Sequence, residues 1–115
     1  IKNNNENAPE APGMLTRHYA PLTKTILVND VKKEIEKYPT KKIGLLLFNN
    51  VTIDKEDVVI EILSKKGSLK EATANLYAAM HRLDTQNLDL IIAQKFPEID
   101  LGNSINDRLE RATKN

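Results

Sequence analysis

The sequence predicts an α/β domain: a small, mostly parallel sheet of four to five strands flanked by helices in three layers, preceded by an extended arm. Three observations indicate this class. From Lys24 onward, apolar segments of strand length alternate with amphipathic segments of helix length. The run Ile43 to Phe48 is apolar throughout, which is typical of a parallel strand covered on both faces. Residues 1–21 hold three of the five prolines and show no apolar periodicity, so they lack the means to form a core.

The first half of the folded part is expected to contain two strands joined by a short helix. Thr25 to Val28 is rich in β-branched and apolar residues, and Asp30 follows it as a helix N-cap. Pro39 ends that helix, and Ile43 to Phe48 then forms the expected centre of the sheet. The inner face of the helix is expected to carry Val31, Ile35 and Tyr38.

A further strand is expected at Val58 to Leu63, and its direction stays open. Nine residues separate it from Phe48, fewer than the dozen or so that a parallel crossover usually takes. We therefore predict this strand without its orientation.

The second half is expected to contain a long helix, a strand and a terminal helix. Ser68 and Glu71 have the spacing of a capping box, and they follow a break at Gly67. Asp89 to Ala93 has the composition of a buried strand, and we expect the terminal helix to begin near Ser104, after Gly102. The apolar face of the long helix comprises Leu69, Ala72, Leu76, Ala79, Met80 and Leu83.

Composition argues against several classes of function. The net charge is +1 and the lysines occur in separate pairs, which is unlike a dedicated nucleic-acid surface. There is no cysteine, so disulfides, thiolate nucleophiles and cysteine zinc sites are excluded. His18 and His81 stand 63 positions apart with no carboxylate at a shared ligand spacing, so no metal site is expected. No apolar run approaches the ~20 residues of a membrane-spanning helix, and a cytoplasmic location is the default expectation.

The arm concentrates specialised residues where there is no hydrophobic reason for order. Pro12-Gly13 fits a type II turn, and Pro21 favours an extended chain before it. Between them, Arg17 offers a guanidinium for phosphate, His18 titrates near neutrality, and Tyr19 has a ring that stacks and a hydroxyl that donates. The three side chains form a set suited to contacting a nucleotide, although a plain linker is an equal alternative.

Two further sites have a functional and a structural interpretation. The loop Lys65 to Ser68 precedes a helix N-terminus, where an anion is favoured, but a single glycine matches no phosphate-binding fingerprint and a capped helix explains the loop as well. Asn106, Asp107 and Arg108 form either a surface salt-bridge set or a contact to another domain. No nucleophile elbow, catalytic triad or paired-carboxylate pattern is visible in the folded part, so catalysis by this chain alone is not expected.

The arm and the second half resemble a known family, the two-domain threonylcarbamoyl-AMP synthases, in which a YrdC-like catalytic domain precedes a linker and a smaller domain. The arm is similar to the family's linker at Ala11 to Met14 and at His18-Tyr19-Ala20-Pro21. The rest of the resemblance comprises Asn75 to Ala79, Leu83-Asp84, Asp89 to Ala93, Phe96-Pro97, Leu101-Gly102 and Asn106 to Leu109.

The resemblance implies a linker at residues 1–22 and a Rossmann-like accessory domain at residues 23–115. It implies a parent enzyme that makes threonylcarbamoyl-AMP from threonine, bicarbonate and ATP with Mg²⁺, releasing pyrophosphate, for the modification of adenosine in tRNA. The catalytic domain of the same chain is the expected partner, neither a cofactor of the domain's own nor direct tRNA binding is expected, and Arg17, His18 and Tyr19 belong to a lid over the nucleotide. Two alternatives stay open: a stand-alone nucleotide- or RNA-binding module using Lys65 to Ser68, and a docking domain for another protein.

Overall fold

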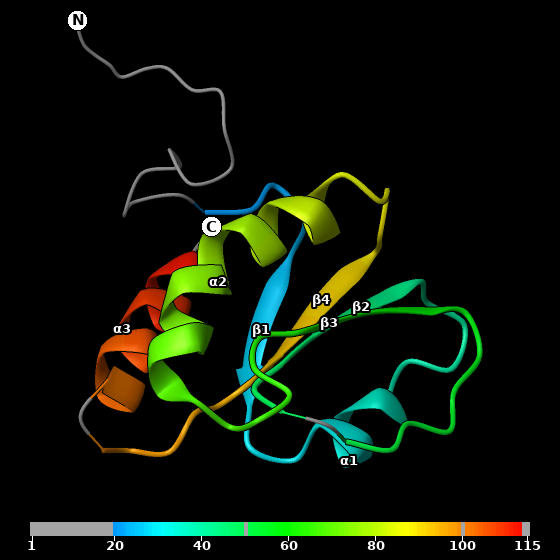
Figure 1. Ribbon diagram of the computed structural model, residues 1–115. Helices are drawn as coiled ribbons and strands as arrows, with labels where there is room; N and C mark the ends of the chain where they lie inside the picture. Colours follow the sequence, from blue (N-terminus) through cyan, green and yellow to red (C-terminus); the bar gives the residue numbers. More distant parts are fainter. Residues whose placement is uncertain (1–19, 50, 100, 114–115) are drawn as a thin grey trace, which may run out of the picture.

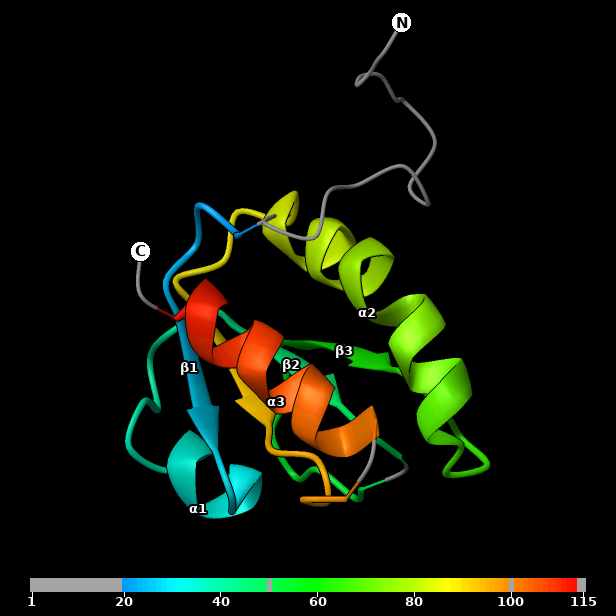
Figure 2. The same ribbon diagram turned by 90° about the vertical axis from the view of Figure 1, so that its left-hand side faces the viewer.

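Four parallel strands form one sheet in the order β1-β4-β2-β3 in the computed structural model, which describes residues 20–49, 51–99 and 101–113. Helices lie on both faces of the sheet: α2 and α3 side by side on one face, and the short α1 on the other (Figure 1 and Figure 2). This arrangement confirms the predicted α/β class and the mostly parallel sheet. The elements are β1 (Thr25–Val28), α1 (Val31–Ile35), β2 (Ile43–Leu47), β3 (Val58–Ile62), α2 (Leu69–Asp84), β4 (Leu90–Gln94) and α3 (Leu101–Ala112).

The two central strands, β2 and β4, are buried on both faces. Every residue of β2 is buried, and so are the first four residues of β4. One apolar cluster fills the space between the sheet and the pair α2 and α3, and a second lies on the α1 side. Each large apolar side chain buried in this way contributes roughly 1.5–3 kcal/mol, so the folded state depends on cover from both faces.

The direction of β3, left open by the sequence, is parallel to β2. Ile43 pairs with Val58 and Leu47 with Ile62, and the described part of the connection, residues 48–49 and 51–57, contains no helix. Val51 and Ile53 of that connection pack against the α1-side cluster. The short crossover suffices because β2 and β3 are neighbours and these two side chains supply the apolar cover that a helix usually gives.

The capping box at the start of α2 is half confirmed. The Ser68 hydroxyl accepts a hydrogen bond from Glu71 N at 3.1 Å, as expected. Glu71 does not reach back to Ser68 N, which donates instead to the Ser64 hydroxyl at 2.8 Å. The Ser64 hydroxyl in turn donates to Glu71 Oε1 at 2.6 Å. A buried serine from the end of β3 therefore completes the cap, which the capping-box spacing does not reveal.

The start of α3 was predicted wrongly, since the helix was expected to begin near Ser104, after Gly102. The helix begins at Leu101 and contains Gly102 in its first turn. Gly102 is buried, and a Cβ at that position would collide with the carbonyl oxygen of Pro97. The glycine serves a close approach between the helix and the preceding loop, not a termination.

Asn106 closes the corner between β4 and α3. Its side-chain oxygen accepts from Phe96 N at 2.8 Å and its side-chain nitrogen donates to Phe96 O at 3.0 Å. The residue is 7% exposed, so both backbone groups of Phe96 lose water and gain the amide as their partner.

None of the helices in the three described ranges is long and apolar enough to cross a membrane.

We predict that Gly102→Ala destabilises the domain by about 1–3 kcal/mol, since the added methyl group must displace the Pro97 carbonyl. Urea unfolding measures the change in midpoint. Gly67→Asn is the matched control: Gly67 has φ +76° with nothing within 4 Å of an added Cβ, and asparagine tolerates this backbone region. Equal losses in the two variants would contradict the steric explanation.

We also predict that Asn106→Leu lowers the free energy of unfolding by about 2–4 kcal/mol, because it strips partners from two buried backbone groups of Phe96. Asp107→Ala, at an exposed position on the same helix, is expected to change it by less than about 0.5 kcal/mol. Thermal unfolding followed by circular dichroism compares the two variants. A loss of stability in Asp107→Ala as large as in Asn106→Leu would show that the hydrogen bonds to Phe96 do not explain the effect.

Candidate functional site

The structure describes the arm from Ala20 onward. Pro12, Gly13, Arg17, His18 and Tyr19 lie outside the described residues, so their predicted contacts stay predictions. Pro21, the predicted end of the linker motif, is buried. The described part of the site is therefore the root of the arm, which we define as residues 20–24.

The root is held by one carboxylate at the end of α2. Asp84 Oδ2 accepts a hydrogen bond from Leu22 N at 3.1 Å. Asp84 Oδ1 accepts two more, from Thr23 N at 2.9 Å and from the Thr23 hydroxyl at 2.8 Å. A single side chain thus binds two consecutive residues of a segment that lies 61 and 62 positions away in sequence.

The root continues into β1 through further backbone contacts. The Thr25 hydroxyl donates to Thr23 O at 3.0 Å, and Ile91 N donates to Lys24 O at 2.8 Å. Thr25 is 4% exposed, so its hydroxyl makes this bond inside the domain. The carbonyl and the amide of Thr23 are both engaged, and the path from the root into the sheet is fixed.

The helix end that carries Asp84 is tied to the sheet on its other side. The Arg82 guanidinium donates to both carboxylate oxygens of Glu61 in β3, at 3.0 Å and 2.8 Å. These hydrogen bonds raise the pKa of Arg82 above its usual value, against the small lowering from burial. The paired geometry holds the last turn of α2 over the edge strand, although an exposed pair of this kind adds little to overall stability.

Sequence reasoning missed the role of Asp84, because the neighbouring His81 and Arg82 suggested a solvated polar face. One signal was present in the sequence. An acidic residue at the last position of a helix faces the negative end of the helix dipole, where basic residues are preferred. A carboxylate in that position calls for hydrogen-bond donors from elsewhere, and residues 22 and 23 provide them.

The loop from Lys65 to Ser68 has little to offer an anion. The hydrogen-bonded set of Ser64, Ser68 and Glu71 uses two of the amides at the start of α2 and places the Glu71 carboxylate there. A negative charge in that position repels phosphate and satisfies the helix dipole itself. The capped-helix interpretation therefore explains this loop.

The carboxyl edge of the sheet, where open α/β sheets usually bind ligands, is closed between β2 and β4 by the domain's own side chains. Gln94 Oε1 accepts from Phe48 N at 2.9 Å across the ends of these strands. The ring of Phe48 lies 4.9 Å, centroid to centroid, from that of Phe96. A side-chain hydrogen bond and an aromatic contact therefore join the ends of these strands.

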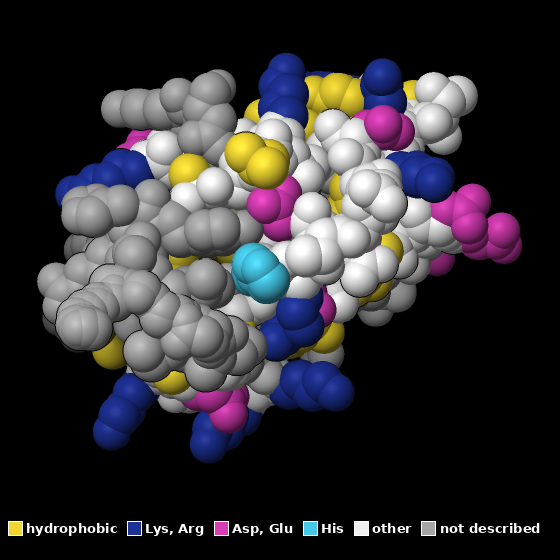
Figure 3. All heavy atoms as spheres, turned by 90° about the horizontal axis from the view of Figure 1, so that it is seen from above, with side chains coloured by type: hydrophobic (Ala, Val, Ile, Leu, Met, Phe, Trp, Pro, Cys, Tyr) yellow, Lys and Arg dark blue, Asp and Glu magenta, His cyan; other side chains and the backbone are white. Residues whose placement is uncertain are grey.

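The surface charge and the lack of a metal-binding group in the described residues also give no support for a nucleotide site in this domain. Seen from above, the basic side chains are scattered around the margin and mixed with acidic ones, without a continuous basic stripe on that face (Figure 3). Within the described ranges, no group of three histidine, aspartate or glutamate residues could hold a metal ion. A hollow of about 650 Å³ lies between α1 and residues 52–57, and it mixes lysine with acidic side chains. Its lining includes none of the predicted site residues.

The set Asn106, Asp107 and Arg108 divides between interior and surface. Asn106 points inward to Phe96, Asp107 is exposed, and Arg108 is half-buried on α3. The three side chains therefore do not form one surface group, and a contact to another domain stays a prediction for them.

Comparisons with known proteins agree with the arrangement of the domain and its arm. Residues 1–113 match the family described as "Threonylcarbamoyl-AMP synthase, C-terminal domain". The chain is 30% identical over 114 residues to the threonylcarbamoyl-AMP synthase of Pyrococcus abyssi, covering 90% of this chain and 32% of that protein. It is 28% identical over 114 residues to the Bacillus subtilis protein of the same name, with the same coverage.

Solved structures show the same relationship. The crystal structure of P. abyssi Sua5 complexed with L-threonine matches with a TM-score of 0.66 and 27% identity, over 93% of this chain and 33% of that one. A double-substitution variant of P. abyssi Sua5 matches with a TM-score of 0.68 over 81% of this chain and 28% of that one, at 23% identity, and shows the fold alone. The chain spans about a third of the length of the curated relatives it matches. This chain belongs to the family of threonylcarbamoyl-AMP synthase C-terminal domains.

Proposed function

We propose that this chain is the accessory part of an enzyme that makes threonylcarbamoyl-AMP from threonine, bicarbonate and ATP, releasing pyrophosphate, for tRNA modification. The family match over residues 1–113, which spans about a third of its relatives' length, carries the proposal. The reaction itself belongs to a YrdC-like catalytic domain of the same chain. A cytoplasmic location fits this role.

The described residues fit poorly to ATP and Mg²⁺. The start of α2 carries its own carboxylate, side chains join the ends of β2 and β4, and the described ranges contain no acidic cluster for a metal. We therefore assign the nucleotide to the catalytic domain, with Arg17, His18 and Tyr19 approaching it from the arm.

Each of the three arm residues has a defined use at such a site. The Arg17 guanidinium matches the geometry of phosphate oxygens, and Tyr19 has an aromatic ring that stacks and a hydroxyl that donates. An arm laid over the pocket excludes water, which would protect a mixed anhydride from hydrolysis. The folded domain then has the task of holding the arm's far end.

The stand-alone binding module is the weaker alternative, because its proposed site at Lys65 to Ser68 is a capped helix start with a carboxylate in place. Direct tRNA binding is not expected either, given the net charge of +1 and the mixed charges on the face in view (Figure 3). A docking role for a separate protein has no described surface that favours it over the catalytic domain as partner.

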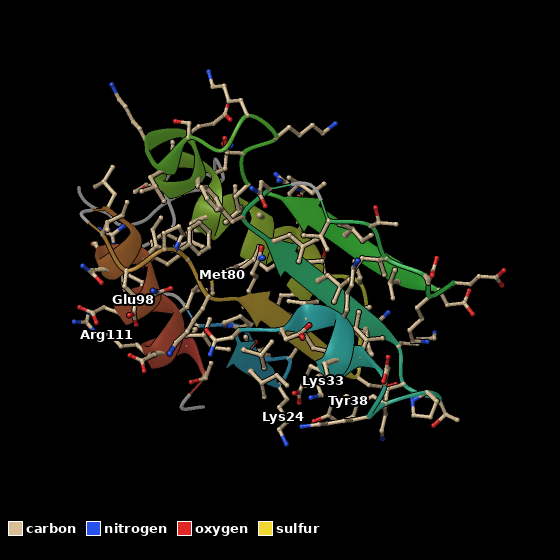
Figure 4. The ribbon with its side chains drawn as sticks, turned by 90° about the horizontal axis from the view of Figure 1, so that it is seen from below. Lys24, Lys33, Tyr38, Met80, Glu98 and Arg111 are labelled. Atoms are coloured by element: carbon tan, nitrogen blue, oxygen red, sulfur yellow. The ribbon has the colours of Figure 1, made fainter. Side chains whose placement is uncertain are left out.

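We predict that Arg17→Ala or Tyr19→Ala in the complete enzyme lowers turnover by about tenfold or more, the scale of losing one charge-assisted hydrogen bond in the reacting complex. The assay is pyrophosphate release from ATP that depends on threonine and bicarbonate. Arg111→Ala is the charge-matched control, because this arginine projects from the outer side of α3 away from the sheet (Figure 4).

Unchanged kinetics in the Arg17 and Tyr19 variants would refute the lid. Pyrophosphate release by residues 1–115 alone would refute the division of labour and place a catalytic site inside this domain.

A further inference from the structure

We infer that Asp84 is a positioning residue for the reaction: it fixes the direction in which the arm leaves the domain, and so the approach of the arm to the nucleotide. The inference rests on the proposed function, because a fixed root matters for catalysis only if the arm covers the catalytic site. It assigns Asp84, which touches no reactant, a role that acts through residues 22 and 23.

The number and placement of the donors carry the inference. One hydrogen bond would hold a distance and leave rotation about it unrestrained. Asp84 accepts three from residues 22 and 23 of the described chain, at 3.1, 2.9 and 2.8 Å, and both oxygens of the carboxylate take part. Two of the donors are the amides of consecutive residues, so the path and the twist of the backbone at Leu22 and Thr23 are set together.

Leu22 is 97% exposed, so apolar packing of its side chain does not fix the root at this residue. Pro21 before it is buried, and Thr25 after it is buried, so the exposed leucine lies between two anchored positions. At this point of the root the backbone bond to Asp84 is the restraint that the structure records.

The carboxylate is also poorly placed for the stability of its own helix. Asp84 is the last residue of α2, where the helix dipole disfavours a negative charge. The hydrogen bonds of Asp84 to the root explain an acidic residue at this position, whereas the stability of the helix does not. The same helix end is tied to β3 through Arg82 and Glu61, so the root is fixed relative to the whole sheet.

The test uses Asp84→Ala in the complete enzyme, with Asp89→Ala as the matched control. Asp89 also accepts a backbone hydrogen bond, from Lys42 N at 2.8 Å, but that bond joins the start of β2 and not the arm. We expect amide exchange at residues 22 and 23 to rise about tenfold or more in Asp84→Ala and to stay unchanged in Asp89→Ala, since the bonds removed are worth about 1 kcal/mol each. Turnover is expected to fall by about fivefold in Asp84→Ala alone, with a thermal midpoint close to that of the Asp89 variant.

Thr23 provides a second and milder pair of variants. Thr23→Ser keeps the hydroxyl that donates to Asp84 Oδ1, and Thr23→Val removes it while keeping the shape. We expect the serine variant to retain turnover and the valine variant to lose about two- to threefold, which is less than in Asp84→Ala because only one of the hydrogen bonds to the carboxylate is removed. An effect of packing would instead appear in the serine variant, which loses the methyl group, and not in the valine variant, which keeps the shape.

The outcomes separate this inference from the function on which it rests. If exchange at residues 22 and 23 does not change in Asp84→Ala while Arg17→Ala still lowers turnover, the positioning role is wrong and the lid stands. If exchange rises and turnover is unaffected in both Asp84→Ala and Arg17→Ala, the lid itself is wrong. Equal effects of Asp84→Ala and Asp89→Ala on turnover would show that Asp84 has a structural role only.

Discussion

Burial of the two central strands on both faces is the constraint from which the rest of the domain follows. Every residue of β2 and the first four of β4 are buried, so each face of the sheet needs an apolar cover. On one face two helices provide it. On the other face the five-residue helix α1 is too short to do so alone, and Val51 and Ile53 of the β2–β3 connection complete the cover. The lack of a helix in the described part of that connection is therefore a feature of the packing.

Side chains of the domain also join the strand ends at the carboxyl edge of the sheet, where open α/β sheets usually bind ligands. The end of β4 turns into α3 through Asn106 and a glycine pressed against Pro97, and Gln94 and Phe48 close the neighbouring strand ends. The backbone amide of Phe48 and both backbone groups of Phe96 therefore already have side-chain partners in the chain. The end of α2 instead provides a carboxylate to which the backbone of residues 22 and 23 is hydrogen-bonded.

The sequence predicted the elements well and their long-range polar contacts poorly. Apolar runs and helical periodicity identified every strand and helix, because burial patterns are local and repetitive. The misplaced start of α3 had a different cause, since glycine serves as a stop signal and as a close contact, and only the position of Pro97 distinguishes them. The direction of β3 and the partners of Asp84 depend on residues that are distant in sequence. The acidic end of α2 indicates that hydrogen-bond donors are needed there, but not which residues supply them.

A segment that covers a site and opens again has two opposing requirements, a fixed root and a free span. Apolar packing is a poor way to fix the root, because it is nondirectional and would also favour collapse of the span onto the domain. Hydrogen bonds to a carboxylate restrain direction at small cost in buried area, and they act on the backbone of whichever residues they reach. Asp84 provides such a restraint at Leu22 and Thr23, while the side chain of Leu22 stays exposed. The polar attachment and the unburied leucine are thus two aspects of one solution, in which hydrogen bonds and not apolar packing hold the root.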